Sequence, residues 1–197
     1  MTETFDGRYH LPPPDIDLRG VRTIWDLGSN VGFTIAHFAH LCPSACIVGV
    51  ELDPDNAAMA RANTQAWADR CAIVQAGVWV HDGTLRYHRQ PGAEYAFRVS
   101  QPGDPDAADA NASARAVSLN TLLARERSGY VDFVKMDIEG AERQVLRENT
   151  EWAAKVNAIK VELHGPYSIT DCIADLEALG FKTSVDSRHQ ACVVGTR

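Results

Sequence analysis

A tight glycine turn near the start of the chain is the first place where residue types and spacing suggest chemistry. Asp26, Gly28, Ser29, Asn30 and Gly32 follow a short apolar run and precede a pattern of helical spacing. Glycine permits close approaches that a Cβ would block, and the first N–H groups of the following helix face whatever lies beside the turn. We therefore predict a ligand site here, with a plain strand–helix connection as the alternative.

Two classes of cofactor compete for this turn. A dinucleotide site prefers Gly-x-Gly-x-x-Gly, which brings a pyrophosphate to the helix N-terminus, but the third glycine of that pattern is absent here. Asp26 would repel a pyrophosphate, whereas it could orient the α-ammonium group of S-adenosylmethionine. Glu51 ends the next predicted strand and can accept both ribose hydroxyls, so it suits adenosine in either cofactor.

A second group of polar residues lies at the ends of two later strands. Asp137 and Glu139 follow one predicted strand, and Glu162 and His164 end the next. Because the carboxyl ends of neighbouring parallel strands share one crevice, we expect Asp137 and His164 to flank a methyl acceptor, with Glu139 as a third catalytic candidate. An unactivated hydroxyl acceptor benefits from a general base, and a histidine can serve as one near pH 7 without large pKa tuning.

Each of these three residues also has a structural alternative. Asp137 could cap the following turn, and His164 could bond within its own loop. Glu139 could complement a helix dipole. Glu142 and Arg143 are expected on a solvated helix face.

A metal site at the same edge is conceivable. Asp137, Glu162 and His164 offer oxygen and nitrogen ligands that divalent ions accept, and strand alternation places Glu162 and His164 on one side. No compact diagnostic spacing accompanies them, so a divalent metal is not favoured.

Alternating strands and helices must position these residues. Strands are predicted at 24–27, 46–51, 72–75, 131–137, 158–163, 181–185 and 191–195. Helices are predicted at 31–41, 54–69, 119–127, 141–147 and 168–179. This order argues for a parallel sheet with right-handed crossovers.

Residues 78–114 interrupt the alternation. Asp82-Gly83 between two strand-like runs is a hairpin signal, and a long loop inside a compact domain is often a lid or binding loop. We therefore predict an insertion that is a candidate substrate lid, with a passive insertion as the alternative. Its expected pieces are a hairpin of 78–80 with 85–87, a strand at 95–99 and an exposed loop at 101–114.

Length and composition limit the function classes. A chain of 197 residues with 45% hydrophobic and 23% charged residues reads as one globular domain. We expect residues 1–20 to form an N-terminal arm, with ordered structure from Val21 and a single domain over 21–197. Pro12–Pro14 favour polyproline II within the arm.

Charge and hydropathy exclude several partners. The formal net charge of −7 argues against a nucleic-acid partner. The longest apolar stretches are far shorter than the ~20 residues that span a bilayer, and the N-terminus has no signal-peptide pattern. The five cysteines are scattered and odd in number, as expected for reduced thiols in a cytoplasmic protein.

Four segments together resemble one family. DLGSNVGFTIAHFA, GVELDP, VKMDIEGAE and VELHG occur in this order, and over residues 24–165 the chain is similar to the S-adenosylmethionine-dependent methyltransferases of the FkbM type. The resemblance implies an α/β, Rossmann-like three-layer sandwich with a class I methyltransferase sheet. That sheet would have about seven mostly parallel strands and an antiparallel C-terminal strand, with the hairpin inserted.

The family likeness also implies a function and binding roles. The methyl group would commonly go to oxygen in a small-molecule, natural-product or glycan acceptor. The turn from Asp26 to Gly32 would hold the methionine part of the cofactor and Glu51 the ribose. Leu52 with Ala76 and Gly77 would flank the adenine.

The leading hypothesis is therefore an S-adenosylmethionine-dependent O-methyltransferase with a small acceptor. An NAD-dependent oxidoreductase on a similar sheet is one alternative, and a non-catalytic nucleoside-binding domain is another. Acceptor contacts are expected from residues 87–113, where no motif names the acceptor. The sequence does not predict an oligomeric state.

Overall fold

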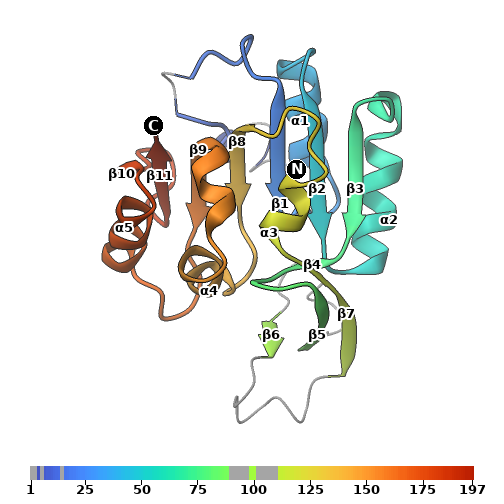
Figure 1. The fold of residues 1–197 in the computed structure, drawn as a ribbon. Helices are drawn as coiled ribbons and strands as arrows, with labels where there is room; N and C mark the ends of the chain where they lie inside the picture. Colours follow the sequence, from blue (N-terminus) through green and yellow to red (C-terminus); the bar gives the residue numbers. More distant parts are fainter. Residues whose placement is uncertain (1–3, 5–6, 14–15, 89–97, 101–110) are drawn as a thin grey trace.

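A seven-stranded sheet forms the centre of the computed structural model, which describes residues 4, 7–13, 16–88, 98–100 and 111–197. The strand order is β10-β11-β9-β8-β1-β2-β3 (Figure 1). Neighbouring strands are parallel except that β11 runs antiparallel to both β9 and β10. The predicted class I sheet with an antiparallel C-terminal strand is confirmed. Its strands are β1 (Thr23–Leu27), β2 (Cys46–Glu51), β3 (Cys71–Gln75), β8 (Val131–Met136), β9 (Val156–Glu162), β10 (Lys182–Val185) and β11 (Cys192–Thr196).

Helices cover both faces of this sheet, which makes three layers (Figure 1). They are α1 (Phe33–Leu41), α2 (Pro54–Asn63), α3 (Leu119–Leu123), α4 (Glu142–Arg147) and α5 (Ile169–Ala178), with short 3-10 helices η2 (Gln65–Trp67) and η4 (Glu151–Lys155). None of the helices in the described part of the chain has the length and apolar character needed to cross a membrane.

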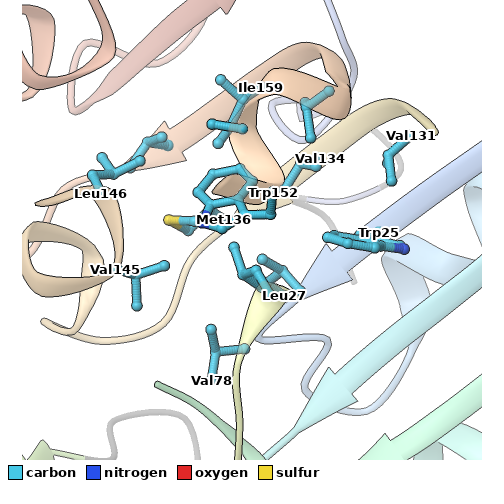
Figure 2. Packing of buried hydrophobic residues seen from close by; sticks show 14 of the residues in the cluster. Trp25, Leu27, Val78, Val131, Val134, Met136, Val145, Leu146, Trp152 and Ile159 are labelled. Atoms are coloured by element: carbon cyan, nitrogen blue, oxygen red, sulfur yellow. The ribbon is translucent and has the colours of Figure 1, made fainter. Parts of the chain in front are cut away.

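One hydrophobic core fills the space between the sheet and helices α3, α4 and α5. Figure 2 shows Trp25, Met136 and Trp152 among its members, and all three are almost fully buried. Strand alternation sends Trp25 and Leu27 to this core, and Ile24 and Asp26 to the other face.

The second core lies between the opposite face of the sheet and helix α1, and the N-terminal arm takes part in it. Ile35 and Phe38 of α1 meet Phe133 of β8 there, and Leu11 of the arm packs against the same cluster. His10 is fully buried. The expectation that ordered structure begins at Val21 is therefore wrong: apolar arm residues bury themselves on the sheet instead of staying in solvent.

The insertion forms a separate small sheet rather than the predicted hairpin. Its order is β4-β7-β5-β6, made of β4 (Gly77–Val78), β5 (Gly83–His88), β6 (Arg98–Ser100) and β7 (Ala112–Val117). The predicted pairing of 78–80 with 85–87 is wrong, because β7 lies between β4 and β5. The Asp82 carboxylate accepts from Ser118 N (2.7 Å), so Asp82 ties the segment before β5 to the junction of β7 and α3 instead of closing a two-residue turn.

Two other boundaries in the insertion differ from expectation or are not described. The loop expected at 101–114 is wrong at residues 112–114, which belong to β7. Most of the strand expected at 95–99 and residues 101–110 of the loop lie outside the described residues. In Figure 1 the small sheet extends from the end of the main sheet toward which β1, β2 and β8 point.

Helix ends follow local capping. The Asp53 side chain accepts from the N–H groups of Asp55 and Asn56, and Ser168 caps α5 in the same way. The helix predicted over 54–69 is wrong beyond Asn63, because Thr64 caps it and η2 follows. The helix predicted over 119–127 ends at Leu123. All five cysteines are unpaired.

Candidate active site

Polar residues occupy two successive rungs on the α1 face of the main sheet. Asp26, Lys135 and Lys160 are register partners across β1, β8 and β9, and all three are buried. Glu162 lies two residues further along β9, and Asp137 two residues after Lys135, so alternation gives them the same face. The second rung lies at the carboxyl edge of the sheet, where ligands bind in open α/β folds.

Lys135 joins these two rungs to the glycine turn. Its Nζ lies 2.9 Å from Asp137 Oδ2 and 3.5 Å from Asp26 Oδ1, and it donates to the Gly28 carbonyl at 3.1 Å. Burial alone would lower the pKa of Lys135, but Asp137 and Asp26 raise it overall. Lys135 is therefore a buried cation that fixes the turn against the edge of β8.

Asp26 lies behind the turn rather than at its open side. Its carboxylate is fully buried and accepts from the Thr34 hydroxyl. Burial raises the pKa of Asp26, which Lys135 and Thr34 counteract. We take the pair with Lys135 as ionised, because Lys135 holds its proton through a second contact with Asp137.

A histidine surrounded by carboxylates lies at the carboxyl edge of β8 and β9, which we call the carboxylate–histidine edge. The Nε2 atom of His164 lies 3.6 Å from both Asp137 Oδ1 and Glu139 Oε2. On its other side Nδ1 lies 2.9 Å from Glu142 Oε1. The structure thus brings Asp137, Glu139 and His164 together, as the sequence predicted.

The protonation states at this edge differ from the expectation for His164. The hydrogen bond to Glu142 raises the pKa of His164 to about 9, so large tuning does occur and the imidazole is mainly protonated at neutral pH. Burial raises the pKa of Glu139 to about 7.

The prediction that Glu142 lies on a solvated helix face is wrong. It is fully buried, not on a solvated face. Besides His164 it accepts from the backbone N–H groups of Ile138 and Gly140. It therefore holds both the turn after β8 and the imidazole ring.

The glycine turn needs left-handed backbone at three positions. Gly28, Asn30 and Gly32 have φ values of +79°, +48° and +81°. A Cβ on Gly28 would lie 1.7 Å from the Asp137 carbonyl oxygen, so the turn and the carboxylate–histidine edge are in direct contact. The Ser29 hydroxyl is buried, and a Cβ on Gly49 would come within 3.0 Å of it, so it faces the sheet rather than the crevice.

The residues expected around adenosine gather on the β2 side of the turn. Glu51 is 4% exposed and accepts from Asn30 N (2.7 Å) and Asp53 N (2.8 Å). Ala76 N donates to the Glu51 carbonyl, and a Cβ on Gly77 would meet Leu52 Cδ1 at 3.0 Å. Burial raises the pKa of Glu51, and the two backbone donors lower it. Each carboxylate oxygen can accept one further hydrogen bond, so the residues fit a ribose diol beside an apolar wall.

The arm contributes a side chain that the sequence analysis missed. Tyr9 packs its ring at 5.5 Å from His189, and its carbonyl accepts from Lys160. Arg188 holds the carbonyls of Leu11 and Pro12 at 2.9 and 2.8 Å. The Tyr9 hydroxyl interacts electrostatically with the charged residues of both rungs, and burial raises its pKa to about 12. No sequence signal marks Tyr9, because the arm meets the site only through tertiary packing.

Three potential metal ligands converge at the same edge. Single ligand atoms of Asp137, Glu162 and His164 all lie within 4.8 Å of one another. Glu162 Oε1 lies 3.9 Å from His189 Nε2, and burial raises the pKa of Glu162.

Comparisons with known proteins agree with this arrangement. A family described as the methyltransferase FkbM domain matches residues 26–183. The hexuronic acid methyltransferase AglP of Haloferax volcanii is 24% identical over 178 residues, which are 88% of this chain and 70% of AglP.

Solved structures share the fold. The precorrin-6y C5,15-methyltransferase of Geobacter metallireducens has a TM-score of 0.54 at 11% identity, covering 98% of this chain and 97% of that one. The fibrillarin of Methanococcus jannaschii has a TM-score of 0.53 at 14% identity, covering 92% and 68%. The N-terminal domain of human METTL16, solved with SAH, has a TM-score of 0.51 at 12% identity, covering 99% and 66%.

Proposed function

The chain belongs to the methyltransferase FkbM domain family, and from this premise we propose that it methylates a hydroxyl group of a small-molecule or glycan acceptor with S-adenosylmethionine. One observation carries the proposal. The glycine turn that would hold the methyl donor is in contact with the carboxylate–histidine edge, through Gly28 against Asp137 and through Lys135. Family membership also sets aside the alternative of an NAD-dependent oxidoreductase.

The cofactor would lie along the carboxyl ends of β1 and β2. Glu51 would accept the ribose hydroxyls through the free lone pairs of its two oxygens, and Leu52 with Ala76 and Gly77 would flank the adenine. The turn of Gly28, Ser29, Asn30 and Gly32 would hold the methionine part by its backbone. When bound, S-adenosylmethionine supplies an electrophilic methyl group.

Asp26 takes a different part from the one its position in the sequence suggests. Because it is enclosed and already meets Lys135 and Thr34, we propose that it positions the turn rather than touching the ammonium group. Asp137, whose backbone meets Gly28, and Glu139 have more open carboxylates, which are 19% and 34% exposed at the side chain.

The acceptor side would use the second group of residues. Asp137 Oδ1 and Glu139 Oε2 are the atoms proposed to receive the hydroxyl proton, since both face the same His164 nitrogen. Lys135 keeps Asp137 in one orientation, and Glu142 does the same for His164. Fixed groups of this kind favour transfer by holding the acceptor in line with the donor.

Calorimetry with S-adenosylhomocysteine tests the cofactor part. We expect saturable binding, weakened roughly 10- to 100-fold in Glu51→Gln, because a charged acceptor of a hydrogen bond is worth about 1.5–3 kcal/mol. Glu148→Gln, an exposed carboxylate on α4's end, should bind like the wild type. Absence of binding to the wild type would refute the proposal.

The acceptor part needs a transfer assay. Because the curated relative is named a hexuronic acid methyltransferase, hexuronic acid conjugates are the first acceptors to test with methyl-labelled cofactor. NMR of the product distinguishes an O-methyl from an N-methyl group. Asp137→Asn should lose turnover while S-adenosylhomocysteine affinity stays, whereas a non-catalytic nucleoside-binding domain would give no turnover with any acceptor.

A further inference from the structure

We propose that Asp137, Glu162 and His164 bind one divalent cation of the Mn²⁺ or Mg²⁺ type at the carboxyl edge of β8 and β9. Two oxygen donors and one imidazole nitrogen, with open positions beside them, make a set that such ions accept. The site is distinct from the groups proposed to hold the cofactor, although its use in catalysis rests on the proposed function.

The geometry is close to that of a coordination shell. The three ligand atoms lie within 4.8 Å of one another, and Asp137 Oδ1 is already 3.6 Å from His164 Nε2. Ligands about 2.2 Å from an ion are roughly 3 Å apart at right angles. Side-chain rotations that bring the atoms together by 1–2 Å, on the order of one torsion step, would complete the shell.

The facing oxygens form no close hydrogen bond within the described part of the chain. The nitrogens beside Asp137 Oδ1 and the Glu162 carboxylate are His164 Nε2 at 3.6 Å and His189 Nε2 at 3.9 Å, respectively. Partly buried carboxylate oxygens normally find a donor or a cation. A divalent cation that displaces the Nε2 proton of His164 would join these oxygens and the imidazole nitrogen in one site.

The Nδ1 side of His164 has the kind of carboxylate partner that metal-binding histidines usually have. Nδ1 of His164 meets Glu142, which is fully buried and is itself fixed by two backbone N–H groups. Such a carboxylate fixes the ring orientation and leaves Nε2 facing the site. In the same way, Lys135 donates to Asp137 Oδ2, so that Asp137 Oδ1 can face the proposed cation.

A cation here would also reduce the repulsion among the carboxylates at this edge. Asp137, Glu139, Glu142 and Glu162 lie around a single lysine and His164. If an acceptor hydroxyl joined the coordination shell, the ion would lower the pKa of that hydroxyl and orient it toward the donor, and with Asp137 on the ion the proton would pass to Glu139 Oε2.

Metal-stripped protein titrated with Mn²⁺, without cofactor or acceptor, tests the site. Calorimetry and EPR should show one Mn²⁺ per chain, with nitrogen coupling in the spin-echo spectrum from a bound imidazole. Glu162→Gln and His164→Gln should each weaken binding at least roughly tenfold, and His164→Gln should remove the nitrogen coupling. Mg²⁺ should compete for the site.

Matched controls keep the result decisive. Glu148→Gln should bind Mn²⁺ like the wild type, and circular dichroism melting confirms that each variant is folded. No saturable Mn²⁺ site, a wild-type spectrum without nitrogen coupling, or unchanged affinity in both folded variants would overturn the inference. A parallel titration with S-adenosylhomocysteine separates the cation site from the proposed cofactor site. If the protein binds S-adenosylhomocysteine but not Mn²⁺, only the cation site is refuted. If it binds Mn²⁺ but not S-adenosylhomocysteine, only the proposed cofactor use is refuted.

Discussion

Lowering the pH from 7 to 5 should destabilise the protein through one buried histidine of the arm. His10 is fully buried, with Nε2 lying 3.0 Å from Nδ1 of His37 and its ring against Phe38. Burial, followed by the nearby His37 and three cationic side chains, lowers the pKa of His10 to about 3. The docked arm therefore requires a neutral imidazole.

The direction and size of this change in stability follow from proton linkage. At His10 the folded state binds fewer protons than the unfolded state between about pH 6.5 and 3, so the contribution of this residue to stability is fully present above pH 6.5 and is lost as the pH falls. With an unfolded pKa of about 6.5, the cost of keeping His10 neutral rises from roughly 0.2 kcal/mol at pH 7 to about 2 kcal/mol at pH 5. Burial also lowers the pKa of His37, which acts in the same direction.

Urea unfolding of matched variants isolates this contribution. His10→Gln keeps an amide that can hydrogen-bond to His37 but does not titrate, so it should lose about 2 kcal/mol less than the wild type between pH 7 and 5. Other titrating groups cancel in this comparison, including His164, whose raised pKa gives stability below pH 6.5 that is lost as the pH rises through 9. His40 is an exposed histidine on α1, the helix that carries His37, and His40→Gln should show the pH dependence of the wild type. Equal pH dependence in the wild type and His10→Gln would refute the reasoning.

Three further changes test packing and buried charge by urea unfolding. Gly49→Ala places a Cβ 2.2 Å from Ile35 Cδ1 and should cost about 1–3 kcal/mol; an unchanged midpoint would contradict this close approach. Phe133→Ala removes a fully buried ring and should cost about 3–5 kcal/mol, with Phe133→Leu costing clearly less. Lys160→Met removes the buried partner of the Asp186 carboxylate, which keeps only Arg188 at 3.5 Å, and should cost about 3–5 kcal/mol; Asp186→Leu in addition should restore much of it. A double variant no more stable than Lys160→Met would argue against this ion pair.

The main sheet could be predicted because its strands carry their own signals. Buried parallel strands read as short apolar runs bounded by glycine or an acid, as in β1 before Gly28 and β8 before Asp137. Asp53 and Ser168 marked helix starts through local hydrogen bonds. These features depend on neighbours in the sequence, so the sequence alone reveals them.

The errors arose where distant segments decide the structure. Asp82-Gly83 has the local chemistry of a tight turn, yet Asp82 binds the backbone 36 residues away and β7 enters between the expected partners. Glu142 looks like a surface helix residue until His164 and the turn after β8 are placed beside it. The arm has polar composition, and its few apolar residues and His10 find partners only on the folded sheet.

The buried charged rung explains how these distant segments come together. An apolar rung would hold the sheet at least as well, because buried ion pairs often contribute little net stability. Asp26, Lys135 and Lys160, however, do more than hold the sheet. Lys135 binds the carbonyl of the glycine turn and the Asp137 carboxylate, while Lys160, its register neighbour, binds the Tyr9 carbonyl of the arm. One row of side chains thus sets the relative positions of the proposed donor side, the proposed acceptor edge and the arm, and its energetic cost is best understood as the cost of that alignment.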